Sequence, residues 1–285
     1  MSDRGTLLRV VPALTALATS TVLVVIVGAV LPGVIALPVF VVGVVVMAVL
    51  LSGRAEATAA QVLAGAREPL GYEVASLKPV FAVLREHHVA GDVDVRVSDS
   101  GRVYATRFGR HTLVVSAGLM RAVRAGGAFD ERAAAIIAHA LGLGVRRFEA
   151  AVAFWTLPWK TMRAVCRAAV ALLSVQPLLS LAWRLRFVTA TAAAVQGITE
   201  GHPVFDLLTA GIVVVTYLVP WCERREQLLL QRQGDRFVIE HGFGTCLAEV
   251  LRPSARAPKA LQRVHALQVG GQRRELTLAP TGAAS

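Results

Sequence analysis

Residues 10 to 51 contain no charged side chain, and this uncharged run constrains the fold of the 285-residue chain more than any other feature. A helix that crosses the hydrocarbon core of a bilayer needs about 20 apolar residues, so the run is about twice as long as one span requires. Pro32 and Gly33 lie near its middle, and this pair breaks a helix and favours a turn. The sequence therefore predicts an N-terminal transmembrane hairpin over residues 1–53, with helices at Val10–Leu31 and Val34–Ser52.

The charges that flank the run predict its orientation. Arg4 and Arg9 precede the first helix and Arg54 follows the second, whereas the turn at Pro32 has no Lys or Arg. The positive-inside rule places such Arg-flanked ends in the cytoplasm. We therefore expect a multi-pass protein of the inner or plasma membrane, with its soluble part facing the cytoplasm.

Composition indicates a lipid bilayer as a partner rather than nucleic acid. Hydrophobic residues make up 55% of the chain, and the net charge of +11 suits a surface that faces anionic lipid headgroups. The Arg residues are scattered, and no basic stretch is interleaved with aromatic residues for base stacking, so we expect no nucleic-acid partner. Cys166, Cys222 and Cys246 are too far apart for a disulfide framework, which indicates a reducing compartment.

After the hairpin, the hydrophobic period predicts a mostly α fold with a small antiparallel β-sheet, an α+β class. Residues 54–90 have apolar side chains at helical spacing, and Asp92–Ser98 then alternates between polar and apolar residues, as a half-buried strand does. Two more short strands are predicted at Val103–Thr106 and Thr112–Ser116, and a helix follows over Gly118–Arg124.

The rest of the chain alternates between apolar and mixed segments. Residues 54–150 form the first part of a folded domain, and residues 151–222 predict an apolar helical pair that is membrane-inserted or re-entrant. Residues 223–278 predict charged, amphipathic helices that complete the domain, and residues 279–285 predict a disordered tail.

Residues 139–143, His-Ala-Leu-Gly-Leu, have the layout of a zinc-peptidase helix without its reactive groups. The usual His-Glu-x-x-His pattern places two imidazoles one helical turn apart to hold Zn²⁺, and its Glu activates the metal-bound water. Here Ala140 replaces the Glu and Leu143 replaces the second His. Only His139 of the three groups remains.

Four segments together resemble the membrane zinc metallopeptidases typified by HtpX and the CAAX prenyl protease, metallopeptidase family forty-eight. Residues 103–119 are similar to the substrate-edge strand pair of that family, and residues 130–142 to the stretch that leads into its zinc helix. Residues 231–237 stand at its Glu-x-x-Ala-Asp pattern, and residues 263–267 at its closing Arg-Ile-x-x-Leu. The resemblance implies a zincin-like fold, and it covers about residues 60–150 and 223–267.

The resemblance also implies a role for each matching residue. His139 matches the first zinc ligand, here vestigial, and Ala140 stands at the position of the general base, so no catalytic residue is expected. Leu143 and Gln231 stand at degenerate ligand positions. Asp235 matches the second-shell carboxylate that orients a zinc-bound His, and a structural pair of His139 with Asp235 is favoured over metal binding.

Two functions follow from these residues. The first is a non-catalytic pseudo-peptidase of the membrane that binds a peptide or a membrane-protein partner and needs no cofactor. The alternative is an active membrane zinc metalloendopeptidase with a rearranged metal site, in which His111, His202 or His241 supplies a substitute ligand. A weaker third interpretation is a scaffold whose basic face holds anionic lipid.

Overall fold

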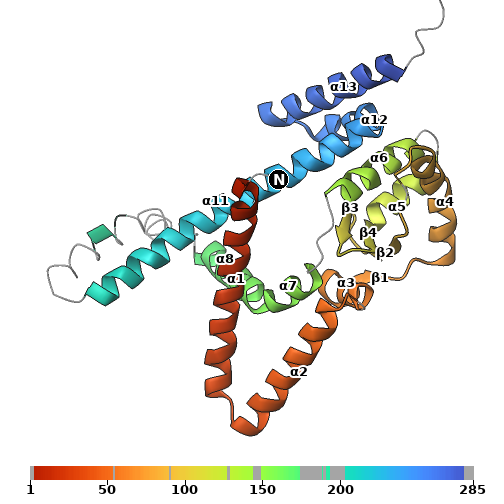
Figure 1. Cartoon of the computed structure of the whole chain (residues 1–285). Helices are drawn as coiled ribbons and strands as arrows, with labels where there is room; N and C mark the ends of the chain where they lie inside the picture. Colours follow the sequence, from red (N-terminus) through yellow and green to blue (C-terminus); the bar gives the residue numbers. More distant parts are fainter. Residues whose placement is uncertain are drawn as a thin grey trace, which may run out of the picture. The chain divides into compact units, whose positions relative to one another are not determined.

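A computed structural model describes residues 3–53, 55–89, 91–126, 129–143, 149–173, 188, 191–192 and 203–278. The described chain is mostly helical and contains one small sheet (Figure 1). It divides into two compact units, of which unit 1 comprises Met1–Gly43 and Trp155–Leu228, and unit 2 comprises Val44–Phe154 and Leu229–Ser285. The predicted tail at residues 279–285 lies outside the described residues.

The uncharged run forms two helices, as the sequence predicts. Helix α1 is Asp3–Val30 and helix α2 is Gly33–Leu51, so the chain leaves the helical conformation at Leu31 and Pro32. Among the described residues, α2 is the one helix long and apolar enough to cross a membrane, and the apolar part of α1, Ala16–Val30, is shorter.

In unit 1, helix α8 (Leu157–Leu173) packs against α1 through polar groups. The backbone N–H of Trp159 donates to Ser20 Oγ at 3.3 Å, and the indole Nε1 of Trp155, two residues before α8, donates to Thr21 Oγ1 at 3.0 Å. Ser20 is fully buried, so its hydroxyl satisfies a first-turn N–H of α8 that has no partner within its own helix. Much of the predicted apolar pair, including residues 174–187, lies outside the described residues.

The sheet in unit 2 is mixed, so the prediction of a wholly antiparallel sheet is wrong. Its strands are β1 (Ala66–Arg67), β2 (Asp94–Ser98), β3 (Ala105–Phe108) and β4 (Thr112–Ser116), in the order β1-β2-β4-β3. The hairpin of β3 and β4 is antiparallel, but β4 lies between β3 and β2 and runs parallel to β2. After β2 the chain passes to the edge of the sheet, where it forms β3. It then returns as β4 between β3 and β2, and β4 therefore runs parallel to β2.

The two faces of this sheet are covered by different clusters of buried apolar side chains. On one face, Phe108 and Val114 pack with Leu50 at the end of α2 and with helices α3 (Glu56–Ala64) and α7 (Glu149–Trp155). On the other face, Val97, Leu113 and Val115 pack with the larger helical core. We call these the α2 face and the α4 face.

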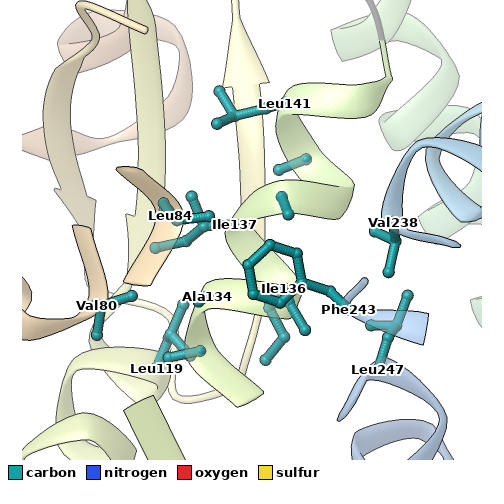
Figure 2. Close-up of a cluster of buried hydrophobic side chains, with 14 of the residues drawn as sticks. Val80, Leu84, Leu119, Ala134, Ile136, Ile137, Leu141, Val238, Phe243 and Leu247 are labelled. Carbon is teal, nitrogen blue, oxygen red and sulfur yellow. The ribbon is translucent and has the colours of Figure 1, made fainter. Parts of the chain in front are cut away.

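Helix α6 (Phe129–Gly142) forms the centre of the larger core, because most of its side chains are buried. Figure 2 shows Val80 and Leu84 of α4 (Gly71–Glu86) on one side of α6, and Val238 and Leu247 on the other. These last two residues belong to α11 (Pro203–Glu240) and α12 (Gly244–Leu251). Helix α5 (Ala117–Arg124) and the last helix, α13 (Pro258–Leu278), which packs along α12, complete this core.

Candidate functional site

Three helices of unit 2 bring three polar residues of the predicted site together with a fourth, Arg263. His139 lies in the last turn of α6, Gln231 and Asp235 lie one helical turn apart on α11, and Arg263 lies on α13. The helices are separated by long stretches of sequence, so only the packed fold assembles the cluster. We call these four residues the polar cluster.

His139 and Asp235 are in contact, as the sequence predicts. The imidazole Nε2 of His139 lies 3.2 Å from Asp235 Oδ1, and the side chains are 20% and 16% exposed. A proton on Nε2 makes His139 a hydrogen-bond donor to Asp235, and a lone pair there makes it an acceptor from Arg263, whose Nη2 lies 3.3 Å away. In either tautomer, Nε2 is engaged within the protein.

Arg263 holds Asp235 through two parallel hydrogen bonds. Its Nη2 donates to Oδ1 at 2.6 Å and its Nε donates to Oδ2 at 2.8 Å, the bidentate geometry that suits a guanidinium and a carboxylate. Burial raises the pKa of Asp235, but the hydrogen bonds from His139 and Arg263 outweigh burial and hold that pKa below its ordinary value. Asp235 is therefore an ionised partner of a cation at neutral pH.

Gln231 contacts the same guanidinium. With its amide oriented by the hydrogen-bond network, Oε1 accepts from Arg263 Nε at 2.8 Å and from Nη1 at 2.5 Å. The side chain at the degenerate third-ligand position therefore serves as an acceptor for Arg263.

The His139 ring lies against the backbone of α11 at Gly234. A Cβ atom at this glycine would lie 2.7 Å from His139 Nε2 and 2.9 Å from Cδ2, closer than any ordinary carbon contact. A similar approach occurs one turn further along, where a Cβ at Gly142 would lie 2.5 Å from the Cβ of Phe237. Glycines at these two positions let the end of α6 and the ring of His139 pack tightly on α11.

The other two positions of the zinc pattern do not face His139 in the way the pattern requires. Ala140 is fully buried in the larger core, and Leu143 follows the end of α6, which stops at Gly142. The spacing of four residues places two ligands on one face only while the helix continues through both. A His side chain at position 143 would therefore project from a turn residue and not from the helix that carries His139.

The rings of His241 and His87 contact other groups. His241 Nδ1 contacts the carbonyl oxygen of Phe237 at 2.8 Å, and His87 Nδ1 contacts the carbonyl oxygen of His241 at 2.8 Å. His111 donates its backbone N–H to the buried Glu56 at 3.1 Å. His202 lies outside the described residues. Within the described ranges, no three His, Cys, Asp or Glu side chains form a group that could hold a metal ion.

Sequence reasoning missed the part that Arg263 takes in this site. The segment Arg263-Val-His-Ala-Leu267 was noticeable for its order along the chain, but nothing in a lone Arg on an amphipathic helix indicates its partner. The signal that could have found it is charge. A partly buried Asp carboxylate needs a cation, and an Arg satisfies both carboxylate oxygens.

Comparisons with known proteins give no relative for this chain. No family model matches it, and no curated protein or solved structure matches it significantly.

Proposed function

We propose that this chain is a membrane-anchored pseudo-peptidase, a protein with a zincin-like fold that binds a peptide or protein partner and has lost hydrolytic chemistry. The observation that carries the proposal is Arg263, whose guanidinium lies 3.3 Å from His139 Nε2 and is bound to Asp235 and Gln231. A permanent cation lies where a metal bound to His139 would need open space.

A catalytic zinc ion does not fit the residues of the polar cluster. Such sites normally have three protein ligands and an open position, whereas one imidazole and one neutral amide remain here. Two unit charges about 4 Å apart repel by about 4 kcal/mol near a protein surface, and a divalent ion doubles the repulsion from Arg263. Ala140 has no group that accepts a proton from water.

Gly234 also supports this assignment. In the Glu-x-x-Ala-Asp pattern an Ala precedes the Asp, whereas this chain has Gly234 before Asp235. A Cβ atom at position 234 would lie 2.7 Å from Nε2 of the His139 ring, so the glycine lets the ring approach the helix. An imidazole that is pressed onto a helix backbone and bonded to Asp235 has a structural role, since it ties α6 to α11.

A binding role needs a surface, and β3 supplies one. It is the edge strand of the sheet, so an extended peptide added beside it would form backbone hydrogen bonds without any catalytic group. We assign this edge as the peptide-binding surface of the proposed function.

For location, we propose that α1 and α2 both cross the inner or plasma membrane and that the part of unit 2 that follows Arg54 faces the cytoplasm. The Arg residues at 4, 9 and 54 and the uncharged turn at Pro32 support this orientation. The partners we propose are the lipid bilayer and a peptide or membrane protein, and none of the sequence features favours nucleic acid.

The test is the metal content of the detergent-purified chain, measured by mass spectrometry without chelators. We expect substoichiometric zinc in the wild type and no chelator-sensitive cleavage of unfolded protein. The variant Ala140→Glu, Leu143→His, Gln231→Glu should still bind zinc weakly while Arg263 remains, and adding Arg263→Ala should raise its zinc content.

Two results would contradict the proposal. Stoichiometric zinc in the triple variant with Arg263 in place would mean that the guanidinium does not compete with a metal. One tightly bound zinc per wild-type chain, with proteolysis abolished by His139→Ala, would establish the active metalloendopeptidase with a rearranged site, and His111, His202 and His241 would then be tested as its missing ligand.

A further inference from the structure

A groove with apolar walls runs along α4 beside the sheet. Val74 and Phe81 of α4, Val95 of β2 and Pro69 line it around a cavity of about 150 Å³, and the buried Leu77 forms its floor. The lining positions on α4 are separated by three or four residues, so they share one face of the helix. Such a cavity is about large enough for one aromatic ring.

Two cations border this groove. Lys78 and Arg85 line it, are exposed, and lie seven residues apart, about 10 Å along the helix. Within the part of the chain that the structure describes, neither forms an ion pair, and Arg85 Nε donates only to the carbonyl oxygen of Phe81, at 3.3 Å.

Two carboxylates on the neighbouring segments are already paired with other cations. Glu73 binds Arg67 at 2.7 Å, and Glu68 binds Arg96 at 2.9 Å. The positive charge at the groove is therefore left for a ligand from outside the described chain.

The groove belongs to the α4 face of the sheet. Val95 packs with the core on that face, whereas Leu50, at the end of the apolar helix α2, packs on the opposite face with Phe108 and Val114. A cavity for one apolar side chain beside two cations favours an acidic segment of a protein as the occupant of the groove.

We propose that this groove binds an acidic segment of a partner protein, with one bulky apolar side chain between Val74 and Val95 and flanking carboxylates paired with Lys78 and Arg85. Apolar burial anchors the segment, and the two cations give specificity and a fast association rate. The site is separate from the β3 edge and does not depend on the proposed pseudo-peptidase function.

The probe is a fluorescein-labelled peptide, Asp-Glu-Asp-Phe-Glu-Asp, titrated with the full-length chain in detergent and followed by fluorescence anisotropy. We expect binding that weakens with salt, and a loss of at least about tenfold in affinity for Lys78→Glu with Arg85→Glu, and for Val74→Asp alone. A matched control is Arg256→Glu with Lys259→Glu, which changes the net charge equally at exposed positions outside the groove and should leave the affinity unchanged.

Peptides in which Ser replaces Phe, or Lys replaces each acid, should bind at least about tenfold more weakly. Equal losses in the groove and control variants would overturn the proposal, because they would reflect net charge alone. Binding that does not need the Phe, or no binding by the wild type at about 1 mM, would also overturn it. The proposal would also be overturned if charge reversal at Lys78 and Arg85 abolished binding to phosphatidylserine vesicles but not to the peptide, since the groove would then be a lipid site.

Discussion

At the scale of single residues, the polar cluster is a structural tie between three helices. Asp235 accepts two hydrogen bonds from Arg263 and lies 3.2 Å from His139, so each side chain limits where the others can lie. Removing one member leaves a partly buried polar group without its partner, which costs about 1 to 3 kcal/mol. The polar cluster therefore contributes to stability because its members satisfy one another's hydrogen-bonding groups, and not through any one contact.

Gly234→Ala tests whether the His139 ring lies on α11 as described. Alanine is favoured over glycine in a helix by about 1 kcal/mol, but its Cβ would lie 2.7 Å from His139 Nε2. We expect Gly234→Ala to lower the free energy of unfolding in the wild type and to raise it by up to about 1 kcal/mol in a His139→Ala background. Denaturation in detergent, followed by circular dichroism, measures both.

The control for Gly234→Ala in the two backgrounds is Gly71→Ala, because a Cβ atom at Gly71 meets nothing within 4 Å. Its effect should be the same in both backgrounds. If Gly234→Ala stabilised the wild type as much as the His139→Ala variant, the ring would not lie against the helix.

Sequence reasoning found His139 through the spacing of the zinc-peptidase helix, and Gln231 and Asp235 through the resemblance to the peptidase family. It predicted the contact between His139 and Asp235, which the structure confirms at 3.2 Å. It could not find Arg263 as their partner, since the contact spans 28 residues to Asp235 and 124 to His139 and depends on how α13 packs. It also could not see that α6 stops before Leu143.

At the scale of elements, short strands were the hardest to predict. β4 has its predicted bounds and β2 lies inside its predicted range, because both alternate or bury apolar residues over five positions. β1 is only Ala66–Arg67, too short for any period, and was missed inside a predicted helical region. The prediction of an antiparallel sheet was wrong because β4 separates β2 from β3 and runs parallel to β2.

A half-buried ion pair joins β1 to α4 and predicts acid sensitivity. Arg67 donates to both oxygens of Glu73 at 2.7 and 2.8 Å, and Glu73 also accepts from the backbone N–H of Leu70 at 2.8 Å. The hydrogen bond from Arg67 is the largest cause that holds the pKa of Glu73 below its ordinary value, and it outweighs burial. A lowered pKa in the folded state means that the folded chain binds the proton less readily than the unfolded chain.

The stability from Glu73 is therefore complete above its unfolded pKa of about 4.3 and is lost as the pH falls through the lower, folded pKa. We expect Glu73→Gln to cost about 1 to 2 kcal/mol at pH 7, since Arg67 is 37% exposed and partly screened. The difference between wild type and variant should shrink below about pH 4. Unfolding curves from pH 7 to pH 3 test this, with the exposed Asp92→Asn as a control, and a constant difference across that range would contradict it.

At the scale of the whole molecule, the chain alternates between the two units, and the apolar segments collect in unit 1. The end of α2 enters unit 2, where Leu50 packs on the α2 face of the sheet. Helix α2 is therefore divided between the two units, and its last residues belong to the folded core of unit 2.

The proposed topology makes a prediction at this scale, because Val34 and Asp92 would lie on opposite sides of the membrane. Val34 is 87% exposed next to the turn between α1 and α2, and Asp92 is exposed before β2. In a chain whose three cysteines are replaced by Ser, Val34→Cys should react with a membrane-impermeant maleimide in intact cells and Asp92→Cys should react only after permeabilisation. Labelling of Asp92→Cys in intact cells would mean that the orientation is the reverse of the proposed one. Protection of both positions in intact cells would mean that the helices do not cross the bilayer as a hairpin, since a turn on the far side has to be accessible.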